Sequence, residues 1–498
     1  MRPDGWVGSR ERRIHASAAG TSRRRERPAR DDYHWIIVGP GCHHFLQPIF
    51  ECFGSSTLRL WAESSISAAD LTRTQCHGLV TAVGNFQGRP VAVVWSDFRV
   101  NGASFGHRNS RRFAAFLQHL DGAGTDPVPL IYVVNSAGVS LMEGRAAFAD
   151  AFALWPALLR YSERHLVLTC AVGKCLGLAP LLFGLGHYRV AVTGQTHINL
   201  TGPEVLTLFF GPSVNFAQNA SAERLHDRTD LVHELVPSIG AAFTRFQGLL
   251  SRFAASEPGQ RAGPRGKLEA LLASFLDSAP QELVPGWSDS VRLFLGRRRG
   301  KAVGLFINPP GRAANLITVR TLDVYAAGLD LFRALEVPIV SFLDSPGVDP
   351  RFDQSDANNL RRMLAVGSQI IHYPHGAMGV VTGRCFGGAS TLVFPKIFGG
   401  RRTVALRGSR MGTMNESIIT RLLQGSPRLL AQWRQVAATQ DAGLTDLLAE
   451  GSLDAVIDPA DLAGEIDRFL GLAAAPHHQG AAGPGRRTML RSPEGGSP

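Results

Sequence analysis

The stretch Gly383-Arg-Cys-Phe-Gly-Gly-Ala389 has a second copy, Gly173-Lys-Cys-Leu-Gly-Leu-Ala179, at an offset of 210 (383 minus 173). A second pair keeps nearly this spacing, because Asp344-Ser-Pro-Gly-Val348 follows Asn135-Ser-Ala-Gly-Val139 at an offset of 209. In both copies, an apolar run typical of a buried strand leads into the Ser-x-Gly loop. Landmarks in one order at one offset predict an internal duplication, in which each copy is a whole domain.

Composition divides the chain into two large halves with short flanks. The chain ends carry Arg-, Ala-, Gly- and Pro-rich sequence without apolar periodicity, which is typical of disorder, and a Gly- and Pro-rich stretch near the middle is typical of a linker. We therefore expect a disordered leader, an N-terminal domain, a linker, a C-terminal domain and a disordered tail, at residues 1–30, 31–254, 255–265, 266–474 and 475–498.

Alternating apolar runs and helical patterns predict an α/β fold with largely parallel strands in each half. In the first half, we expect a hairpin over 78–95, strands over 130–134, 165–171 and 188–192, and helices over 111–120, 143–161, 179–185 and 222–235. In the second half, we expect strands over 303–307, 338–343 and 377–381, and helices over 321–334 and 358–373. Residues 31–74 show no clear pattern.

Charge and cysteine content argue against several classes of function. The net charge is +11, but residues 1–30 alone hold nine Arg against three acids, and no nucleic-acid-binding signature is present, so no nucleic-acid partner is expected. The six cysteines lack the spacing of metal ligands, and no metal is expected. Without a signal peptide or an apolar run that could span a bilayer, we expect a cytoplasmic protein with no membrane partner.

The glycine segments are the candidate chemical sites. A glycine segment between a strand and a helix leaves successive backbone N–H groups free at the helix N-terminus. Such donors can form an oxyanion hole that stabilises an enolate. The alternative is that the glycines only permit close helix–strand packing. Two copies in register, each about forty residues after a Ser-x-Gly loop, favour the chemical interpretation.

Further motifs place these segments in a known context. Together with the two repeats, the motifs Gly88–Gly106, Ser136–Gly144, Leu200–Val205 and Gly451–Pro459 resemble the carboxyltransferase β-subunits of biotin-dependent acyl-CoA carboxylases. The resemblance spans roughly residues 75–470. It implies two tandem crotonase-like (ClpP/crotonase) domains of the β-β-α superhelix type and a homo-hexamer or hetero-oligomer.

The resemblance also implies an activity and its partners. A carboxyltransferase moves CO₂ from carboxybiotin to the α-carbon of an acyl thioester through an enolate. The thioester is acyl-CoA or acyl-ACP, with malonyl-CoA as an expected product. A separate biotin carboxylase or biotin carrier subunit delivers the carboxybiotin, which is not attached to this chain. Fatty-acid or polyketide precursor supply is the pathway expected from the family.

The family's site residues carry over to matching positions. The backbone N–H groups of Gly177 and Leu178 would hold the thioester oxygen, and those of Gly388 and Ala389 the ureido oxygen of carboxybiotin. The remaining positions that the resemblance implies are substrate-binding residues Ser136, Ala137, Gly138, Gly387, Ser390 and Thr391, and, for the cofactor, Gly347 together with Gly388 and Ala389.

Three departures from the family pattern leave alternatives open. Leu178 replaces a glycine, and its side chain is expected to narrow the acyl site or to shift the donor. Ala137 replaces another glycine, and Ser390-Thr391 replaces the usual Tyr-Asp. Leu178 and Ala137 motivate a non-catalytic scaffold subunit as one alternative function. A biotin-independent decarboxylase of malonyl thioesters is the other, because malonate decarboxylase subunits share the implied fold and one carries a segment close to Thr201–Val205.

Overall fold

The computed structural model describes most of the two predicted halves. The described residues are 33–40, 43–53, 57–67, 71–72, 76–122, 124, 126–212, 215–251, 267–310, 315–349, 351, 357–412, 416–439, 444–449 and 451–473. The predicted leader, linker and tail lie outside them. Among the described residues, no helix combines the length and apolarity needed to cross a membrane.

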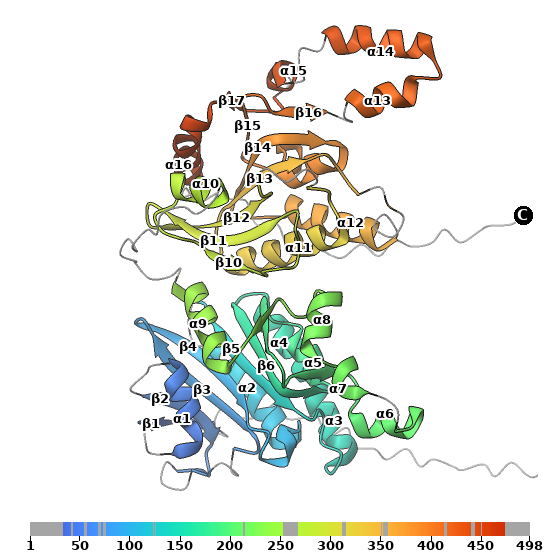
Figure 1. The fold of residues 1–498 in the computed structure, drawn as a ribbon. Coiled ribbons are helices and arrows are strands. Elements are labelled where there is room, and N and C mark those ends of the chain that lie inside the picture. The colour runs from blue at the N-terminus through green and yellow to red at the C-terminus, as the bar shows by residue number, and fades with distance from the viewer. Residues whose placement is uncertain are drawn as a thin grey trace, which may run out of the picture.

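The first half is built on one sheet (Figure 1). Its strands run in the order β1-β2-β3-β4-β5-β6-β7-β9, and β8 pairs with β6. The bounds are β1 Tyr33–Val38, β2 Leu58–Glu63, β3 Leu79–Phe86, β4 Arg89–Ser96, β5 Leu130–Ser136, β6 Val167–Leu176, β7 Tyr188–Val192, β8 His197–Asn199 and β9 Glu234–Val236. Strands β1 to β4 are antiparallel, whereas β4 through β9 are parallel.

Helices cover both faces of this sheet. They are α1 Gln47–Phe53, α2 His107–Gly122, α3 Gly144–Phe152, α4 Leu154–Ser162, α5 Ala179–Phe183, α6 Pro203–Phe210, α7 Phe216–Asn219, α8 Ala222–Arg228 and α9 Ile239–Leu250. Helices α1 and α9 pack together on one face, and α2, α4 and α5 pack on the other. The alternation of side chains along a strand explains why each face has its own apolar cluster.

The second half repeats this plan on a second sheet. Its order is β10-β11-β12-β13-β14-β15-β17, and β16 pairs with β14. The bounds are β10 Gln281–Leu283, β11 Arg292–Arg298, β12 Lys301–Ile307, β13 Ile339–Ser345, β14 Ala377–Phe386, β15 Arg402–Leu406, β16 Arg410–Gly412 and β17 Ala455–Ile457. Strands β10 to β12 are antiparallel, and the pairs from β12 onward are parallel.

The second sheet is also covered on both faces. Its helices are α10 Lys267–Phe275, α11 Val319–Ala334, α12 Ala357–Ile371, α13 Glu416–Leu423, α14 Pro427–Thr439, α15 Leu444–Ala449 and α16 Leu462–Ala473. Helices α10 and α16 share one apolar cluster with the sheet, and α11 lies in the cluster of the opposite face. Figure 1 shows α11 and α12 side by side, in agreement with their mutual contacts.

The two halves are joined by a shared core. One apolar cluster contains Phe246 of α9 together with Trp287, Phe306 and Phe332 of the second half. Polar contacts add to it, because the Arg320 guanidinium donates to the backbone oxygens of Thr229 (2.8 Å) and His226 (2.6 Å). The two repeats therefore pack against one another as parts of one body.

The α/β class is confirmed, with three local corrections. The helix expected over 143–161 breaks at Ala153 into α3 and α4. The helix expected over 222–235 ends at Arg228, because residues 234–236 pair with β7 instead. Residues 31–74, which showed no pattern, supply antiparallel edge strands. The crotonase-like assignment and the domain boundaries stay predictions.

Candidate functional site

The two Ser-x-Gly loops and the two glycine segments meet at the carboxyl ends of paired parallel strands. Strand β5 pairs with β6 in regular register up to Val134, and then Ser136 pairs with Cys175 across an irregularity. Strands β13 and β14 have the same irregularity, after which Ser345 pairs with Cys385. The duplication that the sequence predicted thus extends to the strand register.

In the first half, the loop rests directly on the glycine segment. The buried Ser136 hydroxyl donates to the Ala103 oxygen (2.8 Å) and accepts from the Gly138 N–H (3.1 Å). Gly138 has a φ of 97°, and a Cβ there would lie 3.0 Å from the Leu176 oxygen and 3.2 Å from the Gly177 Cα. Only glycine permits this approach without strain. Ser136, Gly138 and Gly177 are therefore brought together as expected, with Ala137 exposed beside them.

The free donors of the first half lie one residue further along than predicted. The Gly177 N–H donates to the Asn199 oxygen at 3.1 Å, so this donor is engaged. Within the described part of the chain, the N–H groups of Leu178 and Ala179 have no acceptor, because they open helix α5. The repeat offset of 210 also maps Gly388 and Ala389 onto Leu178 and Ala179, and this signal could have identified Ala179 from the sequence. Asn199 carried no comparable signal.

The Leu178 side chain does not narrow the site. It is only 2% exposed and belongs to the apolar cluster that contains Cys175, Phe183 and Phe105. The expectation that this leucine obstructs the acyl site is therefore wrong, because its side chain points into the core while its N–H remains at the helix start.

The second half repeats the loop with a charged anchor. The Asp344 carboxylate accepts from the Arg384 N–H (2.9 Å) and from the Arg384 Nε (2.8 Å). In the first half, the neutral Asn135 accepts from the Lys174 N–H (3.0 Å) at the same place. The Ser345 hydroxyl accepts from Gly347 N–H at 3.2 Å, as Ser136 does from Gly138. Both loops thus share two hydrogen bonds, one to the Asn135 or Asp344 side chain and one to the serine hydroxyl.

The glycine segment of the second half is open. It begins the short helix η5 (Gly387–Val393), in which Gly387 and Gly388 are exposed and Ala389 is buried. Among the described residues, no backbone acceptor in another part of the chain contacts the N–H groups of Gly388 and Ala389. The Ser390 hydroxyl donates back to the Gly387 oxygen (2.7 Å), and Thr391 is half-buried beside it. The pair predicted for this half is therefore available for an oxygen ligand.

Titratable side chains contribute little at the glycine segments. Burial raises the pKa of the Cys385 thiol to about 12, and it raises the pKa of Cys175 as well. Both thiols are therefore protonated near neutral pH, which indicates packing rather than nucleophilic roles. In the described ranges, no three His, Cys, Asp or Glu side chains are grouped to hold a metal ion. The arrangement offers backbone donors that can stabilise negative charge on an oxygen.

Comparison with known proteins shows which proteins this chain is similar to. Residues 59–270 match the carboxyl transferase domain. The propionyl-CoA carboxylase beta chain of Saccharopolyspora erythraea is 22% identical over 461 residues, which cover 81% of this chain and 82% of that protein. The methylmalonyl-CoA carboxyltransferase 12S subunit of Propionibacterium freudenreichii subsp. shermanii is 21% identical over 506 residues, covering 94% and 92%.

Solved structures show the same fold. A transcarboxylase 12S crystal structure superimposes with a TM-score of 0.71 at 20% sequence identity, covering 82% of this chain and 84% of that one. The resemblance to carboxyltransferase β-subunits of biotin-dependent acyl-CoA carboxylases, which the sequence motifs predicted, is thereby confirmed.

Proposed function

We propose that this chain is the carboxyltransferase component of an acyl-CoA carboxylase, transferring a carboxyl group from carboxybiotin to the α-carbon of an acyl thioester. The observation that carries the proposal is the matched pair of backbone donors, Leu178 with Ala179 and Gly388 with Ala389, each beside a Ser-x-Gly loop. Two sites that each bind one oxygen suit a reaction with two carbonyl-containing substrates.

In the first half, the N–H groups of Leu178 and Ala179 would hold the thioester oxygen. Negative charge develops on this oxygen when the α-proton leaves, and each aimed donor is worth about 3–4 kcal/mol in comparable acyl-transfer sites. The bond from Gly177 to Asn199 fixes the orientation of the two donor peptide groups. Gly177 would thus position the donors. The proposed donor pair is Leu178 and Ala179, in place of the pair Gly177 and Leu178 that the sequence predicted.

In the second half, the N–H groups of Gly388 and Ala389 would hold the ureido oxygen of carboxybiotin. The segment fits this role, because the exposed Gly387 and Gly388 carry no side chain that would block a ring from the backbone. Gly347 supports the segment, since a Cβ there would lie 3.4 Å from the Phe386 oxygen. Carboxybiotin would supply both the carboxyl group and a nitrogen that takes the α-proton, so the chain needs no side-chain base.

The proposed thioester is a short-chain acyl-CoA. The relatives are named for propionyl-CoA, for acetyl- or propionyl-CoA and for methylmalonyl-CoA. These names favour coenzyme A over an acyl carrier protein, and carboxyl transfer over the decarboxylase and scaffold alternatives. Ser390 and Thr391, which replace the usual Tyr-Asp, would contribute to the choice of acyl group. A separate biotin carrier would be the partner, as in a biotin-dependent carboxylase.

Exposed apolar helix faces support assembly into a hexamer. On α6, Leu208 and Phe209 are 85% and 79% exposed, and on α12, Leu360 and Leu364 are 65% and 75% exposed. Such faces mark protein–protein contacts, and the transcarboxylase 12S is described as a hexamer. Light scattering on the purified protein tests this proposal: we expect six copies at micromolar concentration, and a monomer would contradict it.

Activity on purified protein tests the reaction. We propose to supply malonyl-CoA or methylmalonyl-CoA, with and without free biotin, and to follow the decarboxylated product. Product that depends on biotin supports carboxyl transfer, whereas product formed equally without biotin supports the decarboxylase, and no product in either case supports the scaffold.

A backbone variant sharpens this test. Ala389→Pro removes one donor N–H of the second half, and we expect the biotin-dependent rate to fall by about 10²-fold or more. Ala389→Gly keeps the N–H and is the matched control. Equal rates for the two variants would show that the Ala389 N–H does not bind the reacting oxygen.

A further inference from the structure

A second cavity lies in the first half, at the edge opposite the glycine segments. It has a volume of about 630 Å³ and is formed by the β3–β4 turn, the segment leading into β5, and the ends of α2 and α9. Strands β4, β5 and β6 are parallel, and the cavity lies where β4 and β5 begin, whereas the glycine segment lies where β6 ends. Its size is within the range of small-molecule sites, about 300–1,000 Å³.

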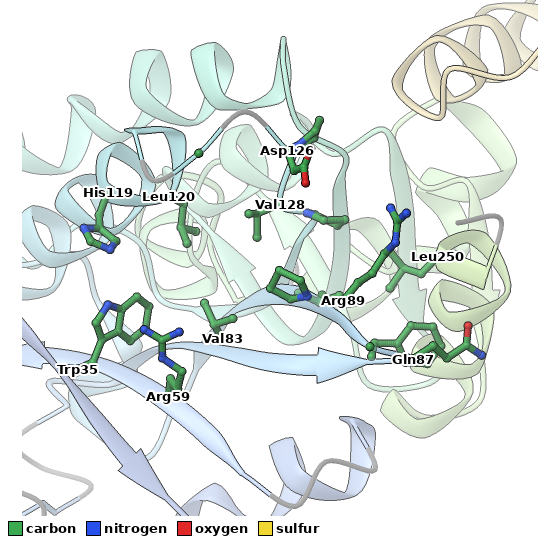
Figure 2. A pocket seen from close by; sticks show the side chains of 17 residues that line it. Trp35, Arg59, Val83, Gln87, Arg89, His119, Leu120, Asp126, Val128 and Leu250 are labelled. Atoms are coloured by element: carbon green, nitrogen blue, oxygen red, sulfur yellow. The ribbon is translucent and has the colours of Figure 1, made fainter. Parts of the chain in front are cut away.

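The middle of the cavity is apolar. Figure 2 shows Val83, Leu120 and Val128 between the two ends of the cavity. Val83 belongs to β3 and Val91 to β4, and both are buried in the sheet. Because these side chains belong to the core, the floor is preformed and offers apolar contact to a hydrocarbon or aromatic body.

One end of the cavity carries an arginine that lies over an aromatic ring. The Arg59 guanidinium lies 4.6 Å from the ring centre of Trp35. The ring of His119 packs against those of Trp35 (5.6 Å between centres) and Trp61 (4.3 Å). Among the described residues, Arg59 forms no ion pair with an acid. A guanidinium that is stacked on an aromatic ring keeps its planar N–H edge available and matches a carboxylate in a bidentate manner.

The net charge of the cavity lining favours one charge state of the ligand. Arg59 lies at one end, and Arg89 and the acidic Asp126 lie elsewhere on the wall. Its arginine and aspartate side chains give the lining a net charge of +1 (two arginines minus one aspartate), which suits a monoanion better than a doubly charged phosphate. We propose that this cavity binds a small amphipathic carboxylate, with its apolar body on Val83, Leu120 and Val128 and its carboxylate on Arg59.

This site is independent of the proposed carboxyl transfer, and a binding experiment tests it directly. Octanoate is the probe, titrated into the full chain by calorimetry, with octanol and octylamine as neutral and cationic counterparts. We expect octanoate to bind at least about tenfold more tightly than either. Equal binding of octanol would overturn the proposal, because Arg59 would then contribute nothing.

Variants locate the site. Arg59→Gln is expected to weaken octanoate binding by about tenfold or more, and Arg59→Lys to weaken it less. Arg160→Gln, at an exposed arginine of the same half outside the cavity, is the matched control and should leave binding unchanged. Unchanged binding in Arg59→Gln, with the fold verified by circular dichroism, would contradict the proposal.

A competition experiment separates this site from the predicted catalytic one. Octanoate binding should be the same with and without saturating coenzyme A, because the cavity lies at the opposite edge of the sheet. Displacement of octanoate by coenzyme A would assign the binding to the carboxyl-transfer site and would overturn the proposal of a second site.

Discussion

The two halves share a loop, a strand register and a set of hydrogen bonds, but they differ in the structure that supports the glycine segment. In the first half, Leu178 is buried and α5 begins at once; in the second, Gly388 is exposed and the short η5 begins instead. The backbone donors of the first half thus belong to a residue whose side chain is buried, which we call the packed support (Leu178). Those of the second half belong to an exposed glycine, which we call the open support (Gly388). A duplicated scaffold can therefore keep its donors while its two sites adapt to different ligands.

The largest difference should appear when the packed support is removed. Leu178→Ala deletes a buried side chain and leaves a cavity, so we expect a loss of about 2–5 kcal/mol in the free energy of unfolding. Urea denaturation measures it. Leu429→Ala, at a residue 51% exposed on α14, should change stability by about 0.5 kcal/mol at most. A similar small effect for Leu178→Ala would mean that the first half is as open as the second.

The next largest difference should be between the side chains that anchor the two Ser-x-Gly loops, Asp344 and Asn135. Asp344→Ala removes a charged acceptor from the backbone and side chain of Arg384, and we expect a loss of about 1.5–3 kcal/mol. Asn135→Ala removes the neutral counterpart and should cost about 1 kcal/mol. The same chemical-denaturation measurement compares them. Equal losses would show that the ion pair of the second half adds nothing to the shared hydrogen bond.

A third difference between the halves concerns how their stability responds to low pH. In the first half, His165, His187 and His233 each accept a backbone N–H at the start of a strand through Nδ1, at 3.1, 3.0 and 3.3 Å. Burial lowers the pKa of His165 to about 4 and lowers the pKa of the other two. In the second half, the position that matches His165 holds the half-buried His375. The buried imidazoles of the first half must stay neutral to accept these bonds.

Stability should therefore fall as the pH falls. An unfolded histidine has a pKa near 6.5, so below about pH 6.5 the unfolded chain binds protons that the folded chain excludes, and stability is lost down to about pH 4 for His165. Each proton contributes at most about 1.4 kcal/mol per pH unit. His187→Gln should flatten the dependence between about pH 7 and 5, whereas His44→Gln, at an exposed residue, should not. An unchanged slope in His187→Gln would contradict the assignment.

The smallest effect should be at the open support. Gly388 does not have a positive φ, and a Cβ there would lie 3.0 Å from the Val348 Cγ2, a movable side-chain atom. Gly388→Ala should therefore change the free energy of unfolding by less than about 1 kcal/mol. Gly387→Ala, at a φ of 54°, is the contrasting variant and should cost about 1–2 kcal/mol. A larger loss of stability for Gly388→Ala than for Gly387→Ala would contradict this prediction.

The sequence predicted the central strands and the loops, because proline-flanked apolar runs and glycines at special φ are local signals. It could not predict the edge strands at 33–63, whose pairing depends on distant residues. It also missed the break at Ala153, where α3 passes into α4. The 222–235 segment has helical spacing, but pairing with β7 decides its end.

At the candidate site, residue type and spacing identified the loops and the glycine segments. The engagement of Gly177 by Asn199 is a tertiary contact that no spacing reveals. The direction of the Leu178 side chain likewise depends on the apolar cluster that contains Phe105 and Phe183. Phe105 is far from Leu178 in sequence, and Phe183 lies at the other end of α5. The motifs therefore located the segments that supply backbone N–H donors. Which N–H groups in a segment remain free depends on tertiary packing.

The shared core between the repeats limits how the chain can come apart. Phe246 belongs to the first repeat, yet it lies in one cluster with Trp287, Phe306 and Phe332 of the second. A protease that cut between α9 and α10 would yield a nicked molecule that still migrates as one particle, rather than two separable modules. On heating, both repeats should melt in a single transition, since neither can lose its packing without exposing the other.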